Sequence, residues 1–307
     1  MFKFGAYVLR HIRIIPAMAA VLTAISAAAS MAADVTVVAK GLQFPEGVIF
    51  VGNVVYFVDY SASDVLRLVD GKVERVWHQD GCGANGLVEL HGELLVACYE
   101  NGTVVRITTD GKIQKTISHD YAGGNFISPN DLTADSAGGV YFTGSGTQEI
   151  LGKMYYRDPS GQVREVANNI NYANGVGVSR DGKLLYVAES RAGRLLTFDI
   201  GVGGSLSHQA ALVKLADIIG DGRHDRFTPD GLRVDKNGNL FVGLYDGGGF
   251  AVLTAGGKLV KKIDLPAAHH ASLAIAPDGA TVFATATDDA PGGGYRGELL
   301  KVDNPVP

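Results

Sequence analysis

Hydrophobic and polar residues alternate in short runs along most of the chain. In the stretch DGLRVDKNGNLFV, residues 230–242, Leu232 and Val234 alternate with polar neighbours, as in a strand with one buried face. KNGN then forms a turn around Gly238, and LFV returns as the second strand. The segment predicts a β-hairpin, and Asp230 is an unusual residue at the mouth of its first strand.

The hairpin pattern occurs six times along the chain. The copies begin at Glu46, Asn85, Asn130, Asn174, Asp230 and Ala271, at spacings of 39, 45, 44, 56 and 41 residues. The runs between copies also alternate, and they turn at Asp-Gly or Gly-Gly. Four strands in each repeat of about 45 residues are typical of a β-propeller blade. The sequence therefore predicts an all-β fold, a six-bladed β-propeller.

The two ends of the repeat region are predicted to close the ring of blades. VTVVA, residues 35–39, precedes the first copy, and GELLKVD, residues 297–303, follows the last. We expect the N-terminal strand to complete the last blade, because pairing there covers an exposed edge. No long helix or linker interrupts residues 34–307, so a single propeller domain is predicted there, with one long loop at 217–230.

The first 33 residues are predicted to lie outside the fold. Lys3, Arg10 and Arg13 precede an apolar, Ala-rich run over residues 14–29, and small residues follow at 32–33. This is the pattern of a secretory signal peptide, residues 1–33. An uncleaved membrane anchor is the alternative, although the run is short for a spanning helix, which needs about 20 apolar residues. We therefore expect a periplasmic or secreted protein.

Charge and cysteine content narrow the choice of partners. Without the three basic residues of the leader, 24 of the 27 basic residues remain against 32 acidic ones, a net charge of −8. An acidic chain is a poor partner for nucleic acid or, once the leader is removed, for a membrane, and its oligomeric state is left open. Cys82 and Cys98 are the only cysteines. Export would permit a disulfide between them, and two buried thiols are the alternative.

The starts of the six first strands are expected to meet at one end of the central channel. Five of the six residues there carry side-chain oxygens: Glu46, Asn85, Asn130, Asn174 and Asp230. Turn preference explains Asn or Asp before Gly, but it explains neither the Glu nor the recurrence at one repeat position. Carboxylate and amide oxygens suit one hard divalent cation such as calcium, magnesium or manganese; zinc is possible but usually takes N or S ligands.

Four segments of the sequence are similar to a known family. FPEGVIF (44–50), ISPNDLTAD (127–135), NYANGVGVSRDGKLLYVAES (171–190) and PDGLRVDKNGNLFV (229–242) resemble the gluconolactonase family of six-bladed propeller lactonases. That family includes regucalcin, also called senescence marker protein. The resemblance extends over nearly all of residues 34–307.

The resemblance also implies roles for the residues at the channel mouth. Family members hold a divalent ion, often calcium, with one Glu, Asn residues and an Asp on successive blades. The matching residues are Glu46, Asn130, Asn174 and Asp230, and Asp230 would also serve as the catalytic base. Asn85 lies in the neighbouring copy and is expected to contact substrate.

The implied reaction is hydrolysis of a lactone or ester. The ion would polarise the carbonyl, and Asp230 would take the proton from water or attack directly, as in related phosphofluoridate hydrolases. Sugar lactonases of the regucalcin type carry Arg at the position of Ser128. Further predicted substrate contacts are Tyr60, Tyr99 and Tyr245, at the ends of second strands, and His270. The aromatic residues favour an apolar substrate.

Two other functions fit the same sequence. Propellers serve many functions, so the chain could be a non-catalytic propeller that binds a ligand or partner and keeps a structural calcium. It could also be a phosphotriesterase-type hydrolase. A panel of lactones assayed with and without a chelator separates these alternatives.

Overall fold

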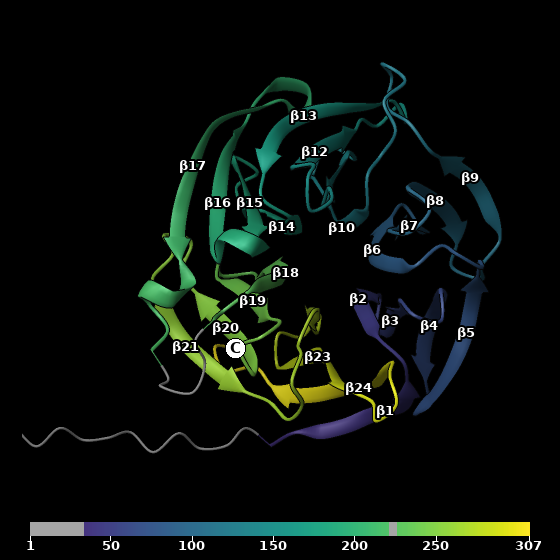
Figure 1. Cartoon of the computed structure of the whole chain (residues 1–307), viewed down its shortest axis with the longest axis vertical. Helices are drawn as coiled ribbons and strands as arrows, with labels where there is room; N and C mark the ends of the chain where they lie inside the picture. Colours follow the sequence, from purple (N-terminus) through teal and green to yellow (C-terminus); the bar gives the residue numbers. More distant parts are fainter. Residues whose placement is uncertain (1–33, 221–225) are drawn as a thin grey trace, which may run out of the picture. The chain divides into compact units, whose positions relative to one another are not determined.

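The structure, a computed structural model, describes residues 34–220 and 226–307. Within them, 24 strands form six four-stranded antiparallel sheets arranged around a common centre (Figure 1). The predicted six-bladed β-propeller is confirmed. The predicted signal peptide and residues 221–225 of the predicted long loop lie outside the described residues. Among the described residues, no helix is both long and apolar enough to span a bilayer.

Each blade runs from an inner strand near the centre to an outer strand (Figure 1). The first three blades are β2–β5 (Pro45–Val51, Val54–Asp59, Asp64–Val69, Lys72–His78), β6–β9 (Ala84–Leu90, Glu93–Cys98, Thr103–Thr108, Ile113–Ile117) and β10–β13 (Pro129–Ala134, Val140–Gly144, Gly152–Arg157, Val163–Ile170). The next two are β14–β17 (Ala173–Val178, Leu184–Glu189, Arg194–Ile200, Leu206–Lys214) and β18–β21 (Pro229–Val234, Leu240–Leu244, Gly249–Leu253, Leu259–Asp264). Short 3-10 helices occur at Ser190–Ala192, Val202–Gly204 and Leu215–Asp217.

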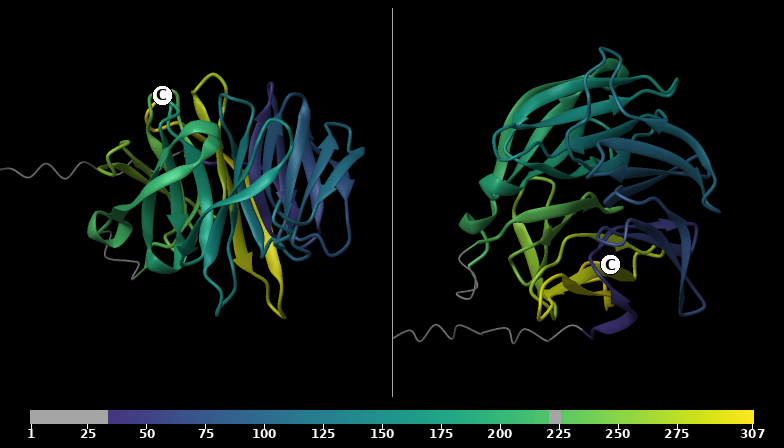
Figure 2. Two further views of the ribbon diagram at one scale, coloured as in Figure 1. Left: turned by 90° about the horizontal axis from the view of Figure 1, so that it is seen from above. Right: turned by 45° about the vertical axis from the view of Figure 1, so that its right-hand side comes forward.

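The sixth blade joins the two ends of the propeller. Its strands are β22 (Leu273–Ile275), β23 (Thr281–Asp289), β24 (Tyr295–Asp303) and β1 (Thr36–Leu42), in that order. β1 pairs antiparallel with β24, with Thr36 opposite Lys301 and Leu42 opposite Gly297. The predicted closure of the last blade by the N-terminal strand is confirmed, and Figure 2 shows it from two further sides.

In the part of the chain that the structure describes, the hydrophobic core consists of six clusters, each between two neighbouring blades. β7 shows how one strand supplies two of them. Leu94 and Val96 pack toward the first blade, whereas Leu95 and Ala97 pack toward the third. Successive side chains of a strand point to opposite faces, so a strand buried on both faces is apolar at nearly every position.

Cys82 and Cys98 form a disulfide, and both residues are fully buried. It joins the loop before β6 to the end of β7 within one blade. Of the two alternatives raised by the sequence, the structure has the disulfide and not the pair of thiols.

Removing this disulfide should destabilise the protein. Because the two cysteines are 16 residues apart, we expect the Cys82→Ala/Cys98→Ala variant to lose about 3 kcal/mol of unfolding free energy. Urea unfolding with and without a reductant measures the loss, and the double variant should not respond to the reductant. An unchanged urea midpoint in the double variant would contradict the prediction.

Candidate metal centre and substrate cavity

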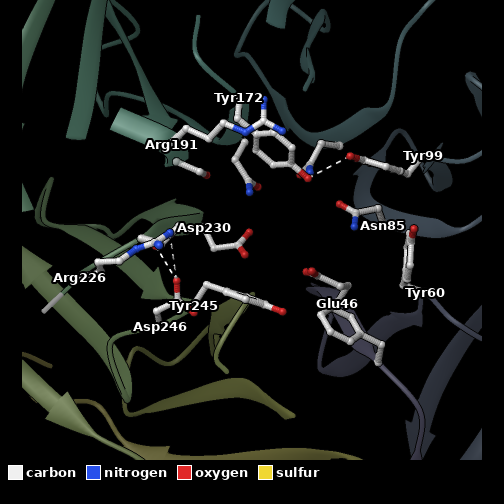
Figure 3. A pocket seen from close by; sticks show the side chains of 15 residues that line it. Glu46, Tyr60, Asn85, Tyr99, Tyr172, Arg191, Arg226, Asp230, Tyr245 and Asp246 are labelled. Atoms are coloured by element: carbon white, nitrogen blue, oxygen red, sulfur yellow. Dashed lines mark hydrogen bonds and ion pairs between the residues drawn. The ribbon is translucent and has the colours of Figure 1, made fainter. Parts of the chain in front are cut away.

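A cavity of about 380 Å³ is lined by residues from five inner strands and from the segments beside them (Figure 3). Six of its residues carry carboxylates or carboxamides, and five of these six come from five different inner strands. We call these five residues the polar ring: Glu46, Asn85, Asn130, Asn174 and Asp230. The other lining residues are Phe44, Tyr60, Tyr99, Tyr172, Ser190, Arg191, Arg226, Thr228, Tyr245 and Asp246. The structure thus brings together all four residues that the resemblance implied as ligands.

The backbone explains why five separate strands present their polar side chains at the same level. Each polar-ring residue is the second residue of its strand, and the pairing of each strand is irregular there. In β18, for example, the register shifts between Pro229 and Leu232. A β-bulge bends the strand and redirects a side chain. The same irregularity in five blades therefore turns five polar side chains into the cavity.

Glu46 and Asp230 are both buried, and the pKa of each carboxyl is raised. Burial is the main cause for both. The charges of Asp230 and then Asp131 add to it for Glu46, and the charge of Asp131 adds to it for Asp230. A hydrogen bond from Asn174 partly offsets the shift of Asp230. Two neighbouring buried carboxyls that disfavour joint ionisation form a site that a cation would stabilise.

The carboxamides provide the test of whether a cation fits. The Oδ1 atom of Asn174 is buried and has no hydrogen-bond partner in the part of the chain that the structure describes. A buried acceptor without a partner is costly, and a cation would supply one. A second cavity, of about 10 Å³, is lined by all five polar-ring residues and lies one residue further along the inner strands. It is the size of about one water molecule.

The polar ring therefore offers the oxygens of two carboxylates and three carboxamides to an ion. Among residues 34–220 and 226–307, no group of three or more His, Cys, Asp or Glu side chains could hold a metal ion. Any ion at the polar ring thus needs carboxamide oxygens. All-oxygen ligands of this kind are those of a hard cation, so the residues present fit calcium.

Without an ion, the polar ring should make stability depend on pH. A carboxyl whose pKa is raised by folding stabilises the folded state fully below its unfolded pKa, about 4. That stabilisation is lost as the pH rises through the raised pKa of Glu46 and Asp230. We expect the melting temperature of chelator-treated protein to fall from pH 5 to pH 8, and calcium to raise it more at pH 8. Melting curves that respond to calcium equally at both pH values would contradict this.

Half of the ten other lining residues of the cavity are aromatic. Tyr60, Tyr99 and Tyr245 line it, where the sequence placed them, and so do Phe44 and Tyr172, which the sequence analysis missed. The hydroxyl groups of Tyr99 and Tyr172 are 3.0 Å apart and share a hydrogen bond. Phe44 and Tyr172 each stand two residues before a polar-ring residue. The two-residue period of a strand places them on the same side, and this spacing was the signal that could have revealed them.

Two arginines lie at the cavity and were also missed (Figure 3). The guanidinium of Arg191 lies over the Tyr172 ring, 4.8 Å from its centroid, and donates to the Thr147 carbonyl at 2.6 Å. Arg226 lies 3.9 Å from Asp246. Arg191 is in a short 3-10 helix and Arg226 lies within the long loop, so no strand pattern marks either residue.

The structure corrects the expectation for His270. This residue is buried outside the cavity, where its ring nitrogens lie 3.1 Å from the Thr285 carbonyl and 3.3 Å from the Ala267 carbonyl. Burial lowers its pKa. The neighbouring His269 instead stacks on Tyr245, with ring centroids 4.4 Å apart. Adjacent residues of an extended chain point in opposite directions, which explains why the two rings have different neighbours.

Comparison with known proteins identifies the family. Residues 44–303 match the family described as SMP-30/Gluconolactonase/LRE-like region. The chain belongs to this family. The resemblance found in the sequence is therefore confirmed, and it covers all four segments on which it was based.

Individual relatives of this SMP-30/gluconolactonase chain agree with that membership. Lactonase drp35 from Staphylococcus saprophyticus is 30% identical over 215 residues, which are 66% of this chain and 62% of that protein. A gluconolactonase from Xanthomonas campestris has a TM-score of 0.70 at 20% identity, covering 86% of this chain and 89% of that one. For the calcium-binding protein regucalcin from Agrobacterium tumefaciens the TM-score is 0.69 at 16% identity, covering 87% and 94%.

These relatives show different things. The two solved structures share less than a quarter of their residues with this chain, so their likeness shows the fold alone. The chain spans between 42% and 62% of the length of the curated relatives it matches first, which is less than two thirds. Family and fold are thus established, and the reaction is the subject of the proposal that follows.

Proposed function

We propose that this protein hydrolyses a lactone or carboxylic ester in the cavity, with a divalent cation held by the polar ring. One observation carries the proposal: two buried carboxyls and the unpartnered Oδ1 atom of Asn174 meet at the cavity. Membership of the SMP-30/gluconolactonase family supports the reaction type. The names of the relatives, a lactonase and a gluconolactonase, support it further.

Glu46, Asn130, Asn174 and Asp230 would hold the cation, and calcium is our first choice. The two carboxylates would balance its charge, and the two carboxamides would complete the oxygen ligands. When bound, such an ion polarises a carbonyl and stabilises the negative charge that develops on its oxygen. The other wall and floor residues then position the substrate around the polar ring.

Asp230 is proposed as the general base. Asp230 lines the cavity, where an oxygen of its carboxylate can accept the proton from attacking water. The hydrogen bond from Asn174 fixes the orientation of this carboxylate and favours its charged form. Asp230 therefore combines the roles of ligand and base, whereas Asn174 is a ligand that also orients Asp230.

The aromatic walls favour an apolar substrate over a sugar-acid lactone. Five aromatic side chains line the cavity, four of them tyrosines, and the faces of their rings provide large apolar surfaces. Ser128, which stands where regucalcin-like sugar lactonases carry Arg, does not line this cavity. We therefore propose alkyl- or aryl-substituted lactones as the first class to test.

A hydrolysis panel tests the proposal. Alkyl lactones, sugar-acid lactones, aryl esters and an aryl phosphotriester are followed by pH change, with chelated protein and with protein given calcium, magnesium, manganese or zinc. We expect calcium-dependent turnover to be greatest with alkyl or aryl lactones. Preference for the phosphotriester would show the second kind of hydrolase, and ion binding without any turnover would favour a non-catalytic propeller.

Asn85 gives a separate test of the substrate position. Asn85→Ala should raise KM with little change in kcat or in calcium affinity, because Asn85 is proposed to contact substrate and not the ion. Steady-state kinetics and calorimetry measure the two effects on the same preparation. Loss of calcium binding in Asn85→Ala would show that this residue is a ligand.

We also propose that the protein is exported to the periplasm or secreted. The Cys82–Cys98 disulfide supports this, because disulfides persist in oxidising compartments. N-terminal sequencing of protein from the native host should give a start near Ala33 or Asp34. An intact Met1 would contradict export by cleavage.

A further inference from the structure

Directly below the polar ring lies a layer that is almost free of side chains. The residue after each polar-ring residue is glycine in four blades, namely Gly47, Gly86, Gly175 and Gly231. A Cβ at Gly86 would lie 2.1 Å from the Asn130 carbonyl oxygen, and one at Gly175 would lie 2.1 Å from that of Asp230. Neighbouring inner strands thus approach too closely for a side chain there. In the third blade this position is Asp131, the exception that carries a charge.

Asp131 is buried and fully hydrogen-bonded. Its carboxylate accepts from the backbone N–H of Leu132 at 2.9 Å and of Val176 at 3.2 Å. It also accepts from Arg233, at 2.7 Å from Nη1 and 3.2 Å from Nη2. Asp131 lines the small cavity beneath the polar ring. A third carboxylate therefore lies next to the proposed ion site and is held away from it by its own partners.

Arg233 is the positive charge that accompanies this third carboxylate. It lies on β18, three residues after Asp230, and its side chain is 18% exposed. Nη1 also donates to the carbonyl of Leu232 at 2.8 Å, so the guanidinium is fixed in place. The interaction of a planar guanidinium with a carboxylate through two nitrogens is stronger and more directional than that of a lysine ammonium. The pair connects β10 to β18 past the intervening blade.

We propose that Asp131 and Arg233 form a positioning pair that sets the charge beneath the ion site. Arg233 neutralises Asp131, so that a divalent ion at the polar ring meets the two uncompensated charges of Glu46 and Asp230 and not three. This inference rests on the ion site proposed above and adds two residues that do not themselves hold the ion.

The geometry agrees with this arrangement. Asp131 lines the small cavity together with Glu46 and Asp230, and each of its two oxygens accepts a hydrogen bond from a nitrogen of Arg233. The negative charge of Asp131 repels the two neighbouring carboxylates and the positive charge of Arg233 attracts them, so the two members of the pair act on the site in opposite directions. If the pair were only a strut, a contact that connects two blades, removing either residue would loosen the same contact. Both single variants would then change calcium affinity in the same direction.

Calcium titration of three variants distinguishes these roles. Asp131→Asn leaves an uncompensated guanidinium below the site, and we expect affinity about tenfold weaker than wild type. Arg233→Gln leaves an uncompensated carboxylate, and we expect affinity about tenfold tighter. In Asp131→Asn/Arg233→Gln both charges are gone, and affinity should return near that of wild type. Arg67→Gln, which breaks an exposed ion pair with Glu74, is the matched control and should not change affinity.

Thermal unfolding of chelated protein provides a second readout. Arg233→Gln should melt lowest, because it leaves a buried carboxylate unpaired beside Glu46 and Asp230, and the double variant should melt higher. If Arg233→Gln does not fold, the calcium affinities of the double variant and of Asp131→Asn are compared instead. The double variant should bind calcium more tightly, because it lacks the arginine that Asp131→Asn leaves uncompensated. Weakening of calcium binding by both single variants would overturn the inference in favour of a strut.

The same titrations separate this inference from the proposed reaction. A wild-type protein that binds no divalent ion overturns both the ion site and the role of the pair. Opposite shifts in the two single variants support the pair, even if no lactone or ester in the panel is hydrolysed. In that case the hydrolase proposal fails alone.

Discussion

The Asp230→Asn variant is expected to lose about 10²–10⁴-fold in turnover at saturating calcium. The substitution keeps the shape of the side chain and one oxygen ligand, but a carboxamide cannot accept the proton of an attacking water. Asp230 is the one buried carboxylate of the polar ring that receives a hydrogen bond from Asn174. Steady-state kinetics on the best substrate of the panel, with calcium raised until kcat no longer changes, measures the loss.

Asn174→Asp is the matched comparison for that experiment. It also keeps an oxygen ligand, and it adds a charge where Asp230→Asn removes one. We expect it to hold calcium and to lose less turnover, because the base itself remains, although the variant gives up the hydrogen bond from Asn174 to Asp230 and reduces the polarising power of the ion. Full activity in Asp230→Asn would refute the base role and move the search to another cavity residue.

Glu46→Gln should weaken calcium binding by at least about 10–100-fold. Loss of a residue that only orients a metal ligand already has an effect of this size, and Glu46 is proposed to bind the ion directly. Glu46 supplies one of the two charges that balance the ion, and it is only 7% exposed. Calorimetric titration measures the affinity, and the calcium-induced rise in melting temperature should shrink in parallel. Glu74→Gln, on the exposed strand β5, is the control. Equal affinities of Glu46→Gln and wild type would exclude this residue as a ligand.

The sequence predicted the fold well because every repeat carries the same local information. The two-residue period and the glycine turn recur in each hairpin, and the need to cover an edge places β1 beside β24. The positions of the polar-ring residues followed from the same register. Because the same pattern occurs in six repeats, a strand that is misassigned in one repeat is corrected by comparison with the other five.

The remaining cavity residues depend on features that occur once. Arg191 and Arg226 come from irregular connections, so no period marks them. Tyr172 has a positive φ of 68°, which an ordinary strand pattern does not predict. In the sixth blade, β22 is only three residues long, and the extended chain before it turns His270 away from the cavity. Asp131 belongs to the ISPNDLTAD segment that resembles the family, but only the structure shows its contact with Arg233, 102 residues away.

The closure of the sixth blade has a consequence for the order of events during folding. Thr36 pairs with Lys301, so this contact forms only after all the residues between them have been synthesised. Contacts of such high sequence separation form late and slowly, because the loop they close must first lose its freedom. The polar ring takes its residues from five blades, so it is complete only when those blades stand in a circle. We therefore expect calcium affinity to appear in the last kinetic phase of refolding, together with β1–β24 pairing, and not with the earlier formation of individual blades.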